Sequence, residues 1–232
     1  MKRFKLDSDV RVVLPDGDIH NLGEYLLPTA VLMVAAVLLM SSLFLPYWSM
    51  KLVAPQYPTG LYVDVYITHL EGDVKEVDAL NHYLGMPKLD EGGRLERSIS
   101  LYTVITFSLL LLGAVFIHNQ WAAILALPVL AFPLVFLADL YFILYTYGHS
   151  IDPNSALGGA IDPFTPKLVG EGTIGQFSTI ASFEAGFYLV LAACVVVVVG
   201  LWFHRRAYKP LVEARKSINQ ALAVGNQEAK SS

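Results

Sequence analysis

Three side chains of this sequence have the chemistry to bind a soft metal ion: His82, Met86 and His149. Imidazole and thioether groups suit Cu(I) better than hard cations. His82 and Met86 are four residues apart, as on one face of a helix, although Gly85 between them is expected to end that helix. His149 would have to approach from another part of the chain. The alternative is that His82 bonds to a loop carbonyl and Met86 packs against a membrane surface.

Two acidic residues lie in or beside long apolar runs. Asp139 is well inside the run at 121–147, and Glu184 is near the start of the run at 181–203. A carboxylate within a membrane is costly and usually faces a bundle interior or a polar cavity. One interpretation is a proton or cation site, as in a transporter or a membrane enzyme. The other is a structural hydrogen bond to the neighbouring loops, and both remain open.

The sequence contains none of the common catalytic motifs. It has no phosphate-binding loop, no HExxH zinc motif, no CxxCH haem attachment site and no serine elbow. Its single cysteine, Cys194, lies in an apolar run and is interpreted as a small apolar filler. A net charge of −4 without a basic stripe argues against nucleic-acid binding. These absences favour a protein that is not an enzyme.

Four apolar runs must position the candidate residues. Hydrophobic residues make up 55% of the chain and charged residues only 16%, far from a soluble domain. A membrane core of about 30 Å requires about 20 apolar helical residues. The runs that meet this requirement are residues 26–45, 98–117, 121–147 and 181–203. The sequence therefore predicts an all-α membrane protein with a bundle of four transmembrane helices.

The loops between these runs fall unequally on the two sides of the membrane. Residues 118–120 are too few to cross a bilayer, so the loops 46–97 and 148–180 must share one side. The two terminal segments carry ten Lys and Arg residues and the two long loops carry six. Because basic residues concentrate on the cytoplasmic side, both termini are predicted to be cytoplasmic and both long loops extracytoplasmic.

The long loops are predicted to fold together as a small α+β extracytoplasmic cap. Residues 54–60 form a proline-rich turn, and residues 61–68 alternate between apolar and polar as in a strand. A helix is expected to start after Asp73, with Asn81 on its apolar stripe as a structural clamp to a neighbouring loop. The loop 148–180 is rich in turn-forming residues and is expected to pack on the first loop.

The complete predicted organisation has eight segments. The N-terminal one is a short hairpin or an ordered lead-in, and the C-terminal one is an amphipathic helix on the inner membrane surface. The segments are a cytoplasmic N-terminal segment at 1–25, membrane helices at 26–45, 98–117, 121–147 and 181–203, extracytoplasmic loops at 46–97 and 148–180, and a cytoplasmic tail at 204–232.

Several loop motifs occur together in a distinctive set. They are the YWSM sequence at 47–50, APQYP followed by Gly-Leu at 54–61, NHYLGM at 81–86, PFTP at 163–166 and Gly-Gln-Phe at 175–177. This set resembles a family of small bacterial four-span membrane proteins associated with gene clusters for nitrous oxide reductase and its copper-site maturation. The resemblance covers about half the chain and implies an accessory role on the periplasmic side of the bacterial inner membrane. Four residues of these motifs are candidates for clamping the cap or docking a partner: Asn81, Tyr57, Gln56 and Trp48.

Three functions follow from these observations. The leading hypothesis is an accessory protein, embedded in the lipid bilayer, that presents its cap to a periplasmic or membrane partner. Its role would be in the maturation or electron supply of a copper enzyme such as nitrous oxide reductase. The first alternative is a structural subunit of a larger respiratory or oxygenase-type membrane complex. The second is a membrane enzyme or transporter that uses a polar cavity at Asp139.

Overall fold

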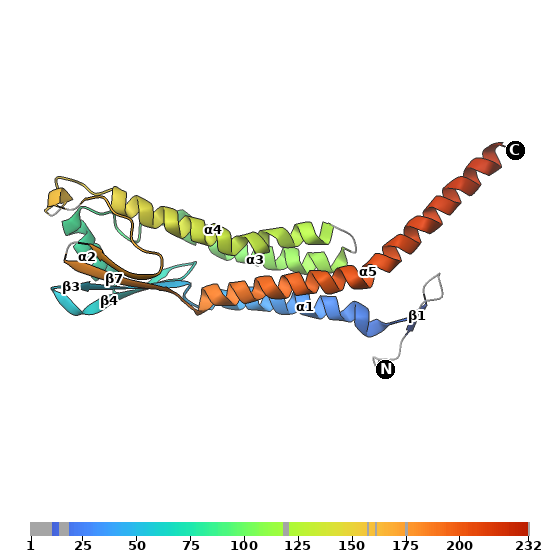
Figure 1. The fold of residues 1–232 in the computed structure, drawn as a ribbon, viewed down its shortest axis with the longest axis horizontal. Helices are drawn as coiled ribbons and strands as arrows, with labels where there is room; N and C mark the ends of the chain where they lie inside the picture. Colours follow the sequence, from blue (N-terminus) through green and yellow to red (C-terminus); the bar gives the residue numbers. More distant parts are fainter. Residues whose placement is uncertain are drawn as a thin grey trace.

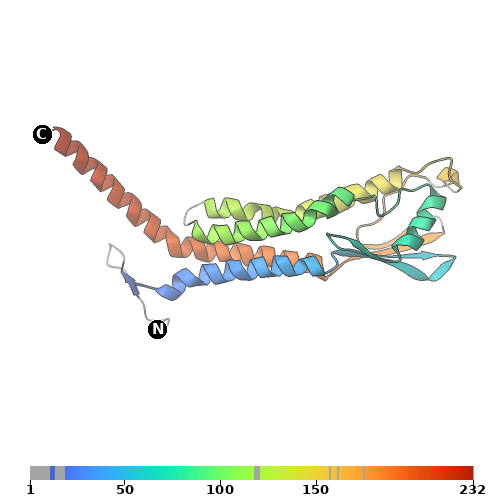
Figure 2. The ribbon, with the colours of Figure 1, turned by 180° about the vertical axis from the view of Figure 1, so that it is seen from behind.

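Four long helices dominate the computed structural model, which describes residues 11–13, 19–117, 121–156, 158–160, 162–174 and 176–231. Each has a segment long and apolar enough to cross a membrane. Two of them, α1 and α5, lie side by side in one layer, and α3 and α4 form the other layer (Figures 1 and 2). The helices are α1 (Leu22–Ser41), α3 (Arg94–Phe116), α4 (Trp121–His149) and α5 (Ala185–Ser231).

Small residues allow α1 and α5 to approach closely. Ala35, Ala36 and Ala193 belong to the buried core of the bundle. A Cβ atom added at Gly200 would lie 2.8 Å from Cδ2 of the buried Leu32, so a larger residue here would displace the Leu32 side chain. Close backbone approach of this kind is how helices associate where no water is present to drive packing.

Cys194 of α5 has a partner on α4. Pro133 of α4 has no N–H group, so the carbonyl four residues earlier, that of Val129, loses its helical hydrogen bond. The Cys194 thiol donates to this carbonyl over 3.4 Å. The cysteine is therefore more than the apolar filler predicted from the sequence, because it also satisfies a polar group that the proline releases.

A five-stranded antiparallel sheet lies at one end of the helices (Figure 1). Its strand order is β5-β4-β3-β7-β6, so strands from the loop before α3 pair with strands from the loop before α5. The expected small sheet next to four long helices is present. We call this sheet and helix α2 the cap, and its elements are β3 (Trp48–Ala54), β4 (Tyr57–Val65), β5 (Leu70–Gly72), α2 (Val74–Leu84), β6 (Gly170–Ile174) and β7 (Phe177–Phe183).

The cap contains more strand than the sequence predicted. The single strand expected at 61–68 is β4, which begins at Tyr57 because Pro55 and Gln56 form a tight hairpin turn after β3. Residues 181–183, assigned from sequence to the fourth membrane span, belong to β7 instead. Their apolar character serves sheet packing, since Ala181 is buried in the cap.

The chain termini differ partly from expectation. Strands β1 (Arg11–Val13) and β2 (Ile19–Asn21) pair as the hairpin that was one of two interpretations. Helix α5 continues through Pro210 to Ser231, so no separate tail helix forms, and its last part leaves the bundle (Figure 1). Strong helix formers in this tail favour the continuation. The predicted turn at 118–120 and the basic residues Lys2, Arg3 and Lys5 lie outside the described residues.

The two faces of the cap sheet have opposite character. Trp48, Met50 and Leu52 of β3 point to the face that α2 and the end of α4 cover, which we call the packed face. Ser49 and Lys51 alternate with them and point to the opposite face, which we call the open face. Side chains from both loops therefore contribute to a single core and to a single exposed surface.

Tyr47 connects the cap to the bundle. Its N–H donates to the Val65 carbonyl (2.8 Å), and its own carbonyl accepts from the Glu184 N–H (3.0 Å). Its fully buried hydroxyl donates to Ser42 Oγ at 2.7 Å, because the Ser42 proton is already directed to the Leu39 carbonyl. Removal from water raises the pKa of this hydroxyl to about 12, so it remains a donor at physiological pH.

Two glycines provide a matched test of this junction. A Cβ atom at Gly186 would lie 2.6 Å from the Tyr47 ring and 2.7 Å from the Leu45 and Pro46 carbonyl oxygens, whereas one at Gly113 would meet nothing within 4 Å. We expect Gly186→Ala to lower the free energy of unfolding by about 1–3 kcal/mol through overpacking. Gly113→Ala should cause no loss, because alanine favours helices. Thermal unfolding in detergent measures both, and an equal response of the two variants would contradict the packing described.

Candidate functional site

The three proposed metal ligands lie in different surroundings. His82 is exposed on α2, and its ring meets the edge of Tyr83. Met86 packs against the apolar core of the cap. His149 stacks on Tyr145, with its Nδ1 2.9 Å from the Tyr145 carbonyl. Within the described parts of the chain, no three His, Cys, Asp or Glu side chains are grouped so as to hold a metal ion. The three side chains therefore have different contacts, and a copper site built from His82, Met86 and His149 stays a prediction.

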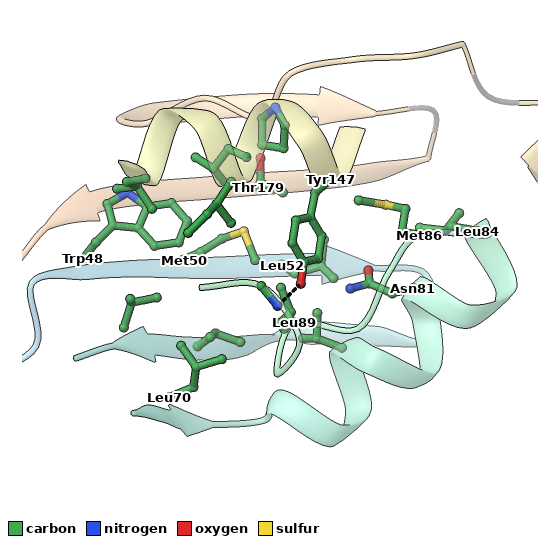
Figure 3. Close-up of a pocket in the computed structure, with 18 of the residues that line it drawn as sticks. Trp48, Met50, Leu52, Leu70, Asn81, Leu84, Met86, Leu89, Tyr147 and Thr179 are labelled. Carbon is green, nitrogen blue, oxygen red and sulfur yellow. Dashed lines mark hydrogen bonds between the residues drawn. The ribbon is translucent and has the colours of Figure 1, made fainter. Parts of the chain in front are cut away.

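A cavity of about 130 Å³ lies inside the cap (Figure 3). Its lining is almost entirely apolar and includes Met50 and Met86. The Trp48 indole N–H donates to the Leu168 carbonyl at 2.7 Å, which connects β3 to the segment before β6. The Tyr147 hydroxyl accepts from the Gly92 N–H at 3.0 Å and donates to the Lys88 carbonyl, which connects α4 to the loop before α3. These bonds hold the second loop and the end of α4 against the first loop beside the cavity.

The four motif residues divide into structural and exposed positions. Trp48 and Asn81 are buried, and the Asn81 amide donates to the Pro87 carbonyl at 3.5 Å. Tyr57 is half-buried against the cap core, and Gln56 is exposed at the tip of the β3–β4 hairpin. Trp48 and Asn81 therefore clamp the cap, and of these four only Gln56 is freely accessible to a partner.

A row of polar side chains crosses the open face at its bundle end. Glu71, Asp64, Ser49 and Ser182 are register partners on four adjacent strands. Glu184 lies between β7 and α5, where its Oε1 accepts from Ser49 Oγ at 2.8 Å and from Ser182 Oγ at 2.9 Å. Glu184 therefore belongs to the open face of the sheet and not to the interior of a helix bundle.

Glu71, Asp64 and Glu184 concentrate negative charge in this row of polar side chains, which we call the acidic row. Burial, together with the charges of Glu184 and Glu71, raises the pKa of the Asp64 carboxyl. Like charges on directly opposite residues of paired strands destabilise a sheet. His69 lies beside this row, since its Nε2 is 3.0 Å from Glu71 Oε1 and its ring stacks on Tyr66.

The sequence analysis missed the open face. Its signal is present in β3, where Ser49 and Lys51 alternate with Met50 and Leu52. That pattern has the period of two typical of a half-buried strand.

Asp139 lines a second cavity, of about 440 Å³, in the groove between α3 and α4. Most of this lining is apolar, and Glu96 and Arg97 lie in it at the cap end of α3. The Asp139 carboxylate forms no hydrogen bond or ion pair with any residue in the described part of the chain. The structural hydrogen bond to the loops that the sequence suggested is therefore not formed within those residues.

No protein-family model and no curated protein matches this chain. The structure itself defines the class: a mostly helical protein with four long apolar helices and a small antiparallel sheet. The helices are compatible with a lipid environment by their length and composition. Two features are candidates for function, the open face of the cap and the groove at Asp139.

The charge on Asp64 provides a test of the acidic row. A raised pKa means that the folded protein holds the Asp64 proton more tightly than the unfolded chain does, so this group's contribution to stability falls as pH rises through its folded pKa. We expect Asp64→Asn to unfold at a higher temperature than the wild type at pH 7. The difference should vanish below the unperturbed value of 3.8. Thermal unfolding between pH 3 and pH 8 measures this.

Asp162→Asn is the control, because Asp162 is an exposed acid in the segment before β6 and outside the row. If the wild type instead unfolds at a higher temperature than Asp64→Asn at pH 7, the ionised Asp64 must have a stabilising partner, which would contradict the acidic row described here.

Proposed function

We propose that this chain is an integral protein of the bacterial inner membrane, with its cap in the periplasm and both termini in the cytoplasm. Exposed apolar side chains on the helices support the membrane placement, among them Leu134 and Phe142, which are 69% and 65% exposed. Such surface is found on soluble proteins only in small patches. The excess of Lys and Arg in the terminal segments supports the orientation.

The function that the geometry favours is an accessory one, in which the open face of the cap docks a protein partner. The observation that carries this proposal is the pair Tyr62 and Ile180, which are 52% and 42% exposed in the middle of the open face. Both lie next to Lys51, and the Lys51 ammonium is 5.0 Å from the centre of the Tyr62 ring. Exposed tyrosines surrounded by polar residues are typical of the centre of a protein interface.

The partner in this proposal is a periplasmic copper enzyme such as nitrous oxide reductase, or a factor that matures it or supplies it with electrons. The loop motifs at 47–50, 54–61 and 81–86 support this partner through the resemblance described above. Copper then belongs to the partner, which agrees with the separate surroundings of His82 and Met86. The acidic row beside the docking centre would favour a partner with a basic surface.

The subunit hypothesis uses the same open face and differs in the lifetime of the complex. A permanent subunit would purify with its partner in a fixed ratio, whereas an accessory protein would be recovered mostly alone. We do not propose the transporter or enzyme function, because the groove at Asp139 is lined mainly by apolar side chains.

The test is complementation in the native host. We expect deletion of the gene to lower the copper content and activity of nitrous oxide reductase, and the wild-type gene to restore both. Tyr62→Ser combined with Ile180→Ser should fail to restore them while accumulating normally in the membrane, since loss of a central aromatic contact costs about 1–4 kcal/mol of binding. Copper analysis of the purified reductase is the readout.

The control is Tyr83→Ser, which removes an aromatic ring that is 59% exposed on α2, outside the open face. It should restore the reductase fully. An unchanged reductase after gene deletion would refute the partner, and full restoration by the double variant would refute the docking face.

A further inference from the structure

The groove between α3 and α4 has a polar end and an apolar end. Gly93, directly before α3, and Ile143 of α4 line its cap end, and Phe107 and Pro128 line its far end. At 1.5 Å per helical residue, the span from Gly93 to Phe107 corresponds to about 21 Å. One leaflet of a bilayer contributes about 15 Å of hydrocarbon. The groove is therefore long enough to hold a lipid chain from the leaflet on the cap side.

The polar atoms at the cap end are mainly acceptors. Ser100 Oγ donates its proton to the Arg97 carbonyl at 2.9 Å, and Thr103 Oγ1 donates to the Ile99 carbonyl at 3.0 Å. Both hydroxyl oxygens are left with only lone pairs to offer the groove. The carboxylates of Glu96 and Asp139 add further acceptors of the same kind.

Neither of these two carboxylates forms an ion pair with a basic side chain among the described residues. The nearest candidate, Arg97, also lines the groove, but its guanidinium is directed elsewhere. Its Nη1 donates to the Gly92 carbonyl at 2.5 Å, and its Nη2 donates to the Asp90 carbonyl at 2.6 Å and lies 3.5 Å from the Asp90 carboxylate. An uncompensated carboxylate at membrane depth is costly, so a cationic donor in the groove would be strongly favoured.

We propose that this groove binds one aminophospholipid of the phosphatidylethanolamine type. Its primary ammonium donates to the carboxylates of Asp139 and Glu96, and one acyl chain follows the apolar lining toward Phe107. A primary ammonium supplies three N–H donors and a positive charge, which an acceptor-lined site requires. This inference rests on the membrane placement proposed above, and it is independent of the protein partner.

The same chemistry discriminates against other lipids of the bilayer. A phosphatidylglycerol headgroup is anionic, so it would meet two carboxylates of like charge. A phosphatidylcholine headgroup carries a positive charge but has no N–H to donate. Bound phosphatidylethanolamine would hold α3 and α4 together beside the bundle end of the cap, because Tyr66 and Ile67 line the same groove.

The test is native mass spectrometry of the full chain, purified from membranes in mild detergent, delipidated and titrated with dioleoyl-phosphatidylethanolamine or dioleoyl-phosphatidylglycerol. We expect one phosphatidylethanolamine to bind at least about tenfold more tightly than phosphatidylglycerol, since a charge-assisted hydrogen bond contributes about 1.5–3 kcal/mol. Asp139→Asn combined with Glu96→Gln should remove this preference. Both replacements are close in shape to the native residues, and thermal unfolding would verify that the variant is folded.

Two further variants separate the groove from its surroundings. Ala131→Phe fills the apolar part of the groove and should weaken phosphatidylethanolamine binding even though both carboxylates remain. Glu91→Gln removes an exposed acid that does not line the groove and should leave the preference unchanged.

Equal binding of the two lipids, or a preference that survives Asp139→Asn with Glu96→Gln, would overturn the inference while leaving the proposed docking function untouched. Recovery of the chain in the soluble fraction would overturn both this inference and the proposed membrane placement. The protein could bind phosphatidylethanolamine selectively while deletion of its gene leaves nitrous oxide reductase unchanged. That pair of results would support the lipid site and refute only the proposed partner.

Discussion

The structure depends on the way one residue, Tyr47, joins the helices to the sheet. Its ring lies between the two layers of helices and contacts Phe132 and Phe136 of α4, with ring centres 6.3 and 5.2 Å away. Its backbone N–H and carbonyl bond to β4 and to the start of α5. Because α1 continues into β3 and β7 continues into α5, this junction makes the helix pair and the strand pair one continuous framework.

A second connection lies at the end of α4. Helix α4 is 29 residues long, or about 44 Å, which exceeds a membrane core by about 14 Å, or roughly two and a half turns. Its last turns form one wall of the cap, where Tyr147 bonds to the loop before α3 and Gly148 bonds to Phe164. Two fixed points leave the sheet little freedom to swing relative to the helices. The open face is consequently held in a constant orientation, which is the property expected of a docking surface and not of a moving lid.

The sequence was most informative where a pattern is local. The long apolar helices and helix α2, with Gly85 at its end in the left-handed conformation, follow from hydropathy and turn chemistry alone. The pairing of β3 with β7 was missed because it joins segments about 130 residues apart, as Ser49 and Ser182 are, whereas the β3–β4 and β6–β7 hairpins are local. Pairing over such a distance leaves no local signature in the sequence.

The candidate sites also separate into what residue type indicates and what only the tertiary structure determines. Residue type drew attention to Asp139 and Glu184 as acids in or beside apolar runs, but their surroundings depend on tertiary structure. Glu184 accepts from two serines on the open face, and Asp139 lines an apolar groove with Glu96. The copper hypothesis grouped His82, Met86 and His149 by chemistry, and the fold gives the three side chains different contacts.

The central claim is that the two loops form one sheet fixed to the helices, and a cysteine pair tests it directly. Ser49 and Ser182 are register partners with hydroxyl oxygens 3.2 Å apart. Opposite residues of antiparallel strands have Cα atoms about 4.5–5.5 Å apart, within the range of a disulfide. In a chain carrying Cys194→Ser, the Ser49→Cys and Ser182→Cys variant should form an intramolecular disulfide under mild oxidation, detected by mass. Two free thiols that both react with maleimide under those conditions would contradict the shared sheet.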